Sequence, residues 1–210
     1  MNPNYQRSKE LEEDVLICLS QFGSATAKQL ALWLFGDTNP SAMTRSHRIS
    51  RRLLGKRLVV QRQGGDGRTR YILGNLGAAR LGIRAGYALS HLNAKHQEKI
   101  IEHLTIMHLQ GYNVFGRRRI WRELDKKYRQ ADGVVLDGLD EGYALIYVHA
   151  MTDAIQKRIT NLKQFAAVRG IGKAELLQRL QILPATTYEQ QEFKLLFAEK
   201  FRDRSVERPS

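Results

Sequence analysis

Two acids and a histidine lie at or near the ends of apolar segments in the second half of the chain. Asp132 is the second residue of the segment 131–136, and His149 lies near the end of the segment 143–150. Glu123 lies a few residues before the first of these segments. Burying a carboxylate costs several kcal/mol unless a metal or a partner compensates its charge. Two carboxylates, an imidazole and water are ligands for a divalent cation, which can activate water and stabilise charge on a phosphodiester. We therefore expect a metal site here.

Each of these groups also has a purely structural alternative. An acid at a strand end can cap a turn or pair with a nearby cation, and a strand-end histidine can hydrogen-bond to the backbone. The ion pairs that the sequence allows are Asp132 with Arg129, and Glu123 with Arg119 or Lys127.

The elements that would position these groups alternate in type. A helix is expected over 93–110, followed by segments with the two-residue period of strands and then by another helix. The expected strands are 112–115, 119–124 after a turn at 116–118, 131–136, and 143–150 after a polar turn at 137–142. A helix is expected from 152 to about 168, and a helical tail over 174–204 with a break at Pro184. This pattern predicts a sheet of few strands covered by helices.

The first half of the chain contains a candidate binding element of a different kind, a basic helix expected over 41–54. Successive residues of a helix are about 100° apart, which separates cations from apolar residues here. The apolar side carries Met43, Ile49, Leu53 and Leu54. The basic side carries Arg45, Arg48, Arg51, Arg52 and Lys56. One side is expected to pack, and the other is free to bind.

A glycine-tipped hairpin follows this helix over 58–73. Its strands are rich in β-forming residues, and Arg62, Arg68 and Arg70 lie on or near its tip. Upstream, apolar residues at helical spacing predict two further helices, the second capped by Thr26. Three helices and a hairpin predict a winged helix-turn-helix that binds duplex DNA. The alternative is a small helical domain whose arginines are only solvated.

Composition sets the broad class of the protein. The chain has 210 residues and a formal net charge of +13, which favours a polyanionic partner. Its length suits two domains, expected at 1–90 and 91–210, both with excess positive charge. The single cysteine, Cys18, lies among apolar residues and is expected to be a buried thiol. Neither a leader nor a membrane-spanning segment is recognisable, so we expect a cytoplasmic protein.

Short motifs along the chain resemble the replication-relaxation family, and most closely its MobC-type relaxases of mobilisable plasmids. The motifs are the N-terminal winged module, the Gly77-Ala78 helix, Trp121-Arg122-Glu123-Leu124, Ala131-Asp132-Gly133 and Lys157-Arg158. This resemblance implies an α+β fold in which a winged helix-turn-helix precedes a restriction-endonuclease-like α/β domain related to the PD-(D/E)XK nucleases.

The same resemblance implies site residues. In such nucleases an aspartate at the second strand and an acidic-x-Lys motif on the next strand hold Mg²⁺ or Mn²⁺, which would place Asp132 in the aspartate role. The acidic-x-Lys position reads His149-Ala150-Met151 here, and an imidazole suits Mn²⁺ better than Mg²⁺. Lys157 would supply the ammonium, and Glu102 is an alternative to Glu123. The expected catalytic set is Asp132, Glu123, His149 and Lys157.

The function implied by the resemblance is metal-dependent nicking of one DNA strand at a plasmid transfer origin, which begins conjugative transfer. Duplex and single-stranded DNA would be the partners, with relaxosome accessory and coupling proteins. Water is the preferred attacking group, with a tyrosine as the alternative. The competing interpretation is a DNA-binding protein that does not cut, either an accessory factor of the relaxosome or a regulator of transcription or replication.

Overall fold

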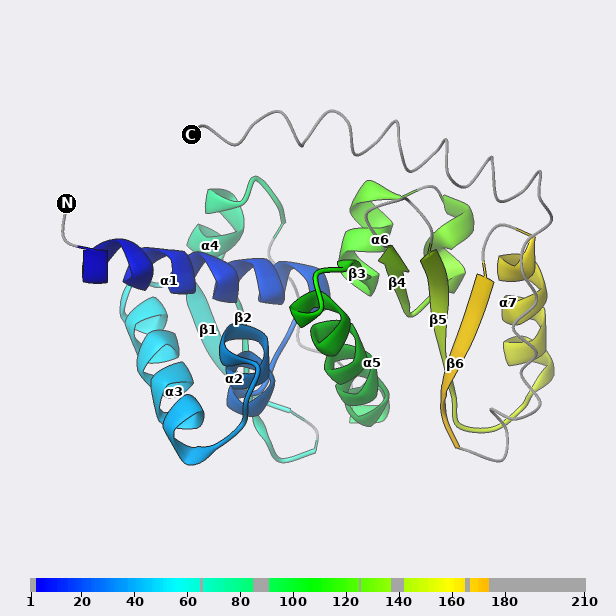
Figure 1. Ribbon diagram of the computed structural model, residues 1–210, viewed down its shortest axis with the longest axis horizontal. Coiled ribbons are helices and arrows are strands. Elements are labelled where there is room, and N and C mark those ends of the chain that lie inside the picture. The colour runs from blue at the N-terminus through cyan, green and yellow to red at the C-terminus, as the bar shows by residue number, and fades with distance from the viewer. Residues whose placement is uncertain are drawn as a thin grey trace. The chain divides into compact units, whose positions relative to one another are not determined.

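The computed structural model describes residues 3–64, 66–84, 91–124, 126–136, 142–164 and 167–173. Its helices and strands form a mixed α+β fold, as the sequence predicts (Figure 1). The chain divides into two compact units, residues 1–109 and residues 110–210.

The first unit combines helices with one antiparallel hairpin. Its described elements are α1 (Pro3–Phe22), α2 (Ala27–Phe35), α3 (Pro40–Gly55), β1 (Val59–Gln63), β2 (Thr69–Leu73), α4 (Asn75–Arg80) and α5 (His91–Leu109). The predicted basic helix and hairpin are therefore confirmed. The hairpin pairs Val59 with Leu73 and Gln63 with Thr69, and Ala25 adds an antiparallel bridge to Tyr71.

The helices of this unit begin where their sequences provide caps. Thr26 and Gln29 form a capping box at α2, because each side chain accepts a hydrogen bond from the other residue's backbone N–H. The core lies among α1, α2 and α3, where Leu16, Leu30 and Leu53 are completely buried. Cys18 is also buried there, and burial raises the pKa of its thiol, so it is an inert packing residue.

Helix α5 belongs to the first unit because it packs on α2. The His108 ring stacks on the Trp33 indole with centroids 4.1 Å apart and planes 4° from parallel. A Cβ placed on Gly36 would lie 3.6 Å from the Leu109 side chain, so the end of α2 also lies against α5. The sequence pattern predicts that this helix belongs to the second domain, with the boundary near residue 90, whereas the two compact units divide after Leu109.

The second unit is built on a four-stranded sheet with the order β3-β4-β5-β6. Its described elements are β3 (Asn113–Gly116), α6 (Arg117–Glu123), the short 3-10 helix η1 (Lys126–Gln130), β4 (Gly133–Leu136), β5 (Gly142–Val148), α7 (Asp153–Lys163) and β6 (Ala167–Gly172). Neighbouring strands are antiparallel from β3 to β5, whereas β6 runs parallel to β5 after the crossover through α7 (Figure 1). One continuous apolar cluster joins the strands to α6, η1 and α7.

Two expectations for this unit are wrong. The sequence predicts a strand over 119–124, but most of these residues belong to α6, where Arg119 and Glu123 form an (i, i+4) ion pair and Ile120 faces the core. The expected helix from 152 to 168 ends at Lys163, and β6 follows. The turn at 137–141 and the tail beyond Lys173 lie outside the described residues.

Gly77 lets α4 lie against the chain between α3 and β1, whereas Gly55 lies in open space. We therefore expect alanine substitutions at these two glycines to have opposite effects on stability. A Cβ at Gly77 would lie 2.0 Å from the Leu58 carbonyl oxygen, whereas one at Gly55 would meet no described atom within 4 Å. We expect Gly77→Ala to lower the free energy of unfolding by about 1–3 kcal/mol. Gly55→Ala should raise it by about 0.5–1 kcal/mol, since glycine weakens helices. Urea unfolding followed by circular dichroism measures both, and equal stability of the two variants would contradict the close approach.

Candidate nucleic-acid interface

Helix α3 starts at a well-defined cap and buries one side completely. The Asn39 side chain accepts a hydrogen bond from the Ala42 N–H at 2.8 Å, and Pro40 occupies the first turn, where its missing N–H costs nothing. Ile49 and Leu53 are at most 4% exposed against the core. The buried side of α3 therefore determines which residues face outward.

The exposed arc of α3 is centred on Arg48. At 100° per residue, Thr44 and Arg51 lie on one side of it and Ser41 on the other, all of them exposed. Within the described residues, neither Arg48 nor Arg51 forms an ion pair. This arc combines two available guanidinium groups with short side chains that let the helix backbone approach a ligand closely.

Two of the predicted DNA-binding cations instead hold α3 to α1. Glu12 is only 4% exposed, and its carboxylate accepts the Arg52 Nε at 3.2 Å and the Lys56 Nζ at 2.5 Å. A buried carboxylate needs such partners, so these cations neutralise Glu12. The sequence contained a signal for this contact, because Glu12 shares the helical spacing of the buried Leu16 and Leu19.

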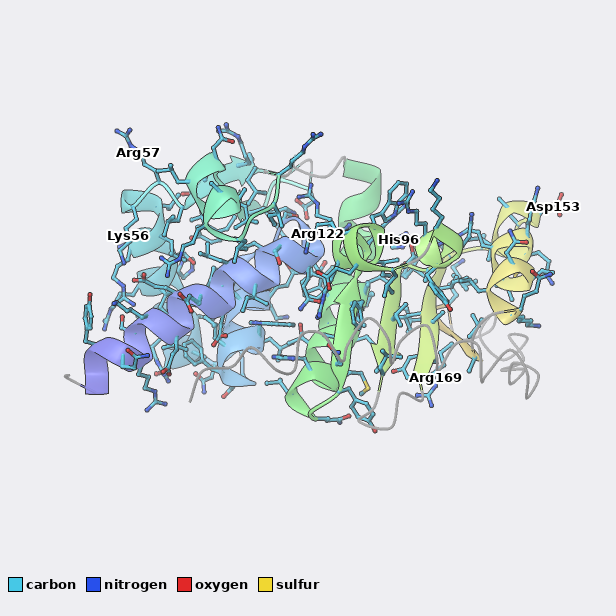
Figure 2. The ribbon with its side chains drawn as sticks, turned by 90° about the horizontal axis from the view of Figure 1, so that it is seen from above. Lys56, Arg57, His96, Arg122, Asp153 and Arg169 are labelled. Atoms are coloured by element: carbon cyan, nitrogen blue, oxygen red, sulfur yellow. The ribbon has the colours of Figure 1, made fainter. Side chains whose placement is uncertain are left out.

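The cation at the end of α3 has an unusual backbone conformation. Arg57 has φ of 57°, the left-handed region that helix ends usually fill with glycine. Its N–H donates to the Leu54 carbonyl and the following Leu58 N–H donates to the Leu53 carbonyl, which completes the helix C-terminus. Figure 2 shows the Arg57 side chain extending outward beyond the ribbon. Sequence reasoning missed this exposed cation.

The hairpin arginines differ in their accessibility. Arg62 is exposed on β1 and lines one open depression together with Arg57. Arg68 is exposed but pairs with Glu98 of α5 at 2.7 Å. Arg70, by contrast, is 2% exposed and donates to Asp66 at 2.8 Å, so the prediction that it contacts DNA is corrected.

The hydrogen bond from Arg70 lowers the pKa of the Asp66 carboxyl below its ordinary value. Asp66 lies at the tip of the hairpin and Arg70 on its second strand, so the ion pair fastens the tip to the strand. Arg70 therefore shapes the hairpin. Arg45, also predicted to bind DNA, is exposed on α3 with its guanidinium 4.0 Å from the centre of the Phe35 ring.

In the second unit, Asp132 is 3% exposed and its Oδ2 oxygen is held by two protein groups. Its carboxylate accepts the Tyr147 N–H at 3.0 Å and pairs with the Arg158 guanidinium at 3.0 Å. Arg158 also donates to the Gln130 carbonyl, so it links α7 to the chain just before β4. The sequence predicts neither the contact with Arg158 nor that with the Tyr147 amide. Of the roles that the sequence allows for Asp132, the ion pair is closer to this arrangement than the metal ligand, but the partner is Arg158 and not Arg129.

The other predicted metal ligands lie in separate surroundings. Glu123 pairs with Arg119 at 2.7 Å, which is the alternative that the sequence offered, and with Arg122 at 3.6 Å. His149 is exposed just beyond the end of β5, and Lys157 is exposed on α7. Glu102 lies on α5 of the first unit and pairs with Lys99.

These donors do not fit a divalent cation as they are arranged. Among the described residues, no group of three His, Cys, Asp or Glu side chains could hold a metal ion. The neighbouring strand β5 reads Gly-Tyr-Ala-Leu-Ile-Tyr-Val and contains neither an acid nor a lysine.

The Asp132–Arg158 pair predicts energetic coupling between β4 and α7. We expect Asp132→Ala to lower the free energy of unfolding by about 3 kcal/mol, because it leaves the buried amide and guanidinium without their acceptor. Arg158→Ala should cost less, since its side chain is 24% exposed. In a double-mutant cycle by urea denaturation, the pair should show about 1–3 kcal/mol of coupling. Strictly additive effects would show that the ion pair contributes nothing.

Comparison with known proteins adds no further constraint. No protein-family model, curated protein or solved structure matches the chain. Within the described part of the chain, every helix is too short or too polar to span a membrane.

Proposed function

We propose that this chain binds duplex DNA through its first unit, which acts as a winged helix-turn-helix domain. In this assignment α2 and α3 form the helix-turn-helix pair, and the β1–β2 hairpin is the wing. The observation that carries the proposal is the exposed arc of α3, where Arg48 and Arg51 face outward while Ile49 and Leu53 pack inward. A helix with this arrangement suits the major groove, which is about 12 Å wide.

The contacts of the cations assign them different roles. Arg48 and Arg51 are the groups that we expect to reach base edges or phosphates, because arginine can form two parallel hydrogen bonds with guanine. Arg57 and Arg62 line a single depression beside α3 and would hold the phosphates next to the groove. Arg52 and Lys56 neutralise Glu12, so their contribution to binding is mainly to orient α3.

The proposal predicts that a double Arg48→Ala, Arg51→Ala variant loses duplex affinity. We expect binding of a labelled duplex to weaken about tenfold or more, since single contacts of this kind contribute about 1–3 kcal/mol. The slope of log affinity against log salt should become shallower by about 0.9 for each phosphate contact removed. Fluorescence anisotropy at several salt concentrations measures both quantities.

Arg80→Ala is the matched control for these variants. Arg80 is an exposed arginine of the same unit, but it lies on α4 and pairs with Glu13. Arg80→Ala removes one positive charge, as each of the two α3 substitutions does, without touching α3, so its duplex affinity and salt slope should stay close to those of the wild type. Equal losses of affinity per charge removed in the control and in the α3 variant would refute the groove assignment and leave only a non-specific effect of net charge.

A second candidate function is the nicking activity of a plasmid mobilisation relaxase, with a transfer origin as the duplex. It is favoured by the arrangement of the second unit. Asp132 directly precedes β4 in the antiparallel set β3-β4-β5, and a crossover through α7 leads from β5 to the parallel strand β6. This strand order suits a restriction-endonuclease-like domain. The contacts of Asp132 favour the alternative, a DNA-binding accessory factor or regulator that does not cut.

Nicking of a supercoiled plasmid that carries the cognate origin separates these two candidates. If the domain cuts DNA, Mn²⁺ or Mg²⁺ should allow conversion to open circles, and Asp132→Asn should prevent it. His149→Ala and Lys157→Ala are the sharper probes, because both residues are exposed and their loss should leave the fold intact. The nicking candidate fails if the wild type leaves the plasmid supercoiled with either ion.

A further inference from the structure

The excess positive charge of the second unit is concentrated in one short segment. Residues 117–130 contain seven lysines and arginines against two acids, whereas the rest of residues 110–210 contains eleven of each sign. This segment contains α6 and η1, which follow each other in the chain and pack together, so its positive charges lie close in space. Such an asymmetry marks a surface for a polyanion.

Helix α6 separates its structural side from its outward side. Ile120 is fully buried, and beside it Arg119 contacts Glu123 and lies 4.1 Å over the Phe115 ring. Arg119 is therefore engaged in holding α6 to β3. The remaining cations of the helix lie on the opposite arc, because residues 117, 118, 121 and 122 fall within about 140° of one another at 100° per residue.

Trp121 lies in the middle of this outward arc and is 50% exposed. Arg129 of η1 places its guanidinium 4.6 Å from the centre of the indole ring and donates to the Trp121 carbonyl at 3.4 Å. The ring is thus fixed from one side by a cation while half of the residue remains accessible. A large aromatic side chain that is held in place and exposed among cations suits stacking with a flat ligand.

The arginines on either side of Trp121 are packed close together. Arg118 is half-buried, and its pKa is lowered by burial and by the neighbouring positive charge of Arg122. Arg117 is exposed in the same turn. A phosphate beside the indole would relieve this repulsion, so the cluster favours an anion over a neutral aromatic ligand.

We infer that the Trp121 face, composed of Arg117, Arg118, Trp121, Arg122 and Arg129, binds single-stranded nucleic acid. A base stacks on the Trp121 indole, and the flanking phosphates contact the arginines. A duplex keeps the faces of its bases inside the helical stack, so it would use the charge of this surface but not the ring. This site is separate from the α3 arc and does not depend on the proposed contact of α3 with duplex DNA.

Intrinsic fluorescence offers a direct test, because the chain has two tryptophans and Trp33 is only 5% exposed. We expect an oligothymidylate of about 15 nucleotides to quench the emission of the wild-type chain. The quenching should disappear in Trp121→Phe, whose only indole is that of Trp33. In Trp121→Ala, the affinity for a labelled oligothymidylate should fall about tenfold, within the range for loss of one stacked base.

Three controls make the result specific. Tyr112→Ala removes another exposed aromatic residue of the same unit and should leave the affinity unchanged. The Arg48→Ala, Arg51→Ala variant should lose duplex binding and keep binding the oligothymidylate, so the two sites can fail independently. Circular dichroism should show native folding of Trp121→Ala, because the replaced ring is half-exposed.

Either of two outcomes would overturn the inference. One is an unchanged affinity of Trp121→Ala for the oligothymidylate, which would show that no base stacks on the ring. The other is equal competition by polyglutamate at matched charge, which would identify the face as a general docking surface for acidic chains.

Discussion

The carboxylate of Glu12 is the contact on which the presentation of α3 depends. It is buried between α1 and α3, where an uncompensated charge would be strongly unfavourable, so it recruits Arg52 and Lys56 from the basic side of α3. Together with the apolar packing of Leu53, this fixes the rotation of α3 about its own axis. Arg48 and Arg51 consequently face outward, and the basic helix separates into cations that hold the fold and cations that can bind.

Much of the fold could be predicted because it follows from local patterns. The sequence alone indicates the cap at Thr26, the two-sided α3 and the apolar strand after Asp132, and each of these elements forms where it is expected. The errors have a different origin. Residues 119–124 form mainly helix because Arg119 and Glu123 pair one turn apart, and β6 forms because Val168 is buried beside β5. A local ion pair in the first case and a tertiary contact in the second override a short and ambiguous pattern.

The candidate sites were less predictable than the fold because charge alone does not show which partner a side chain meets. Arg70 and Arg48 are both arginines in a basic region, yet Arg70 is buried against Asp66 and Arg48 is exposed. Likewise the sequence shows Asp132 as an acid in an apolar setting, but the compensating group is Arg158, which lies 26 residues further along the chain. Partners so distant in sequence leave no local signal, since only the folded sheet and its crossover helix bring them together.

At Arg57 the left-handed backbone lowers stability, while the side chain places a positive charge at the end of α3. A glycine there would avoid the steric cost that a side chain incurs in this conformation, which is about 1 kcal/mol. The chain nevertheless places a long cation at the helix end, in the same depression as Arg62. Selection for stability alone would favour losing this side chain, so an arginine retained here over evolutionary time would mark a requirement that folding does not impose.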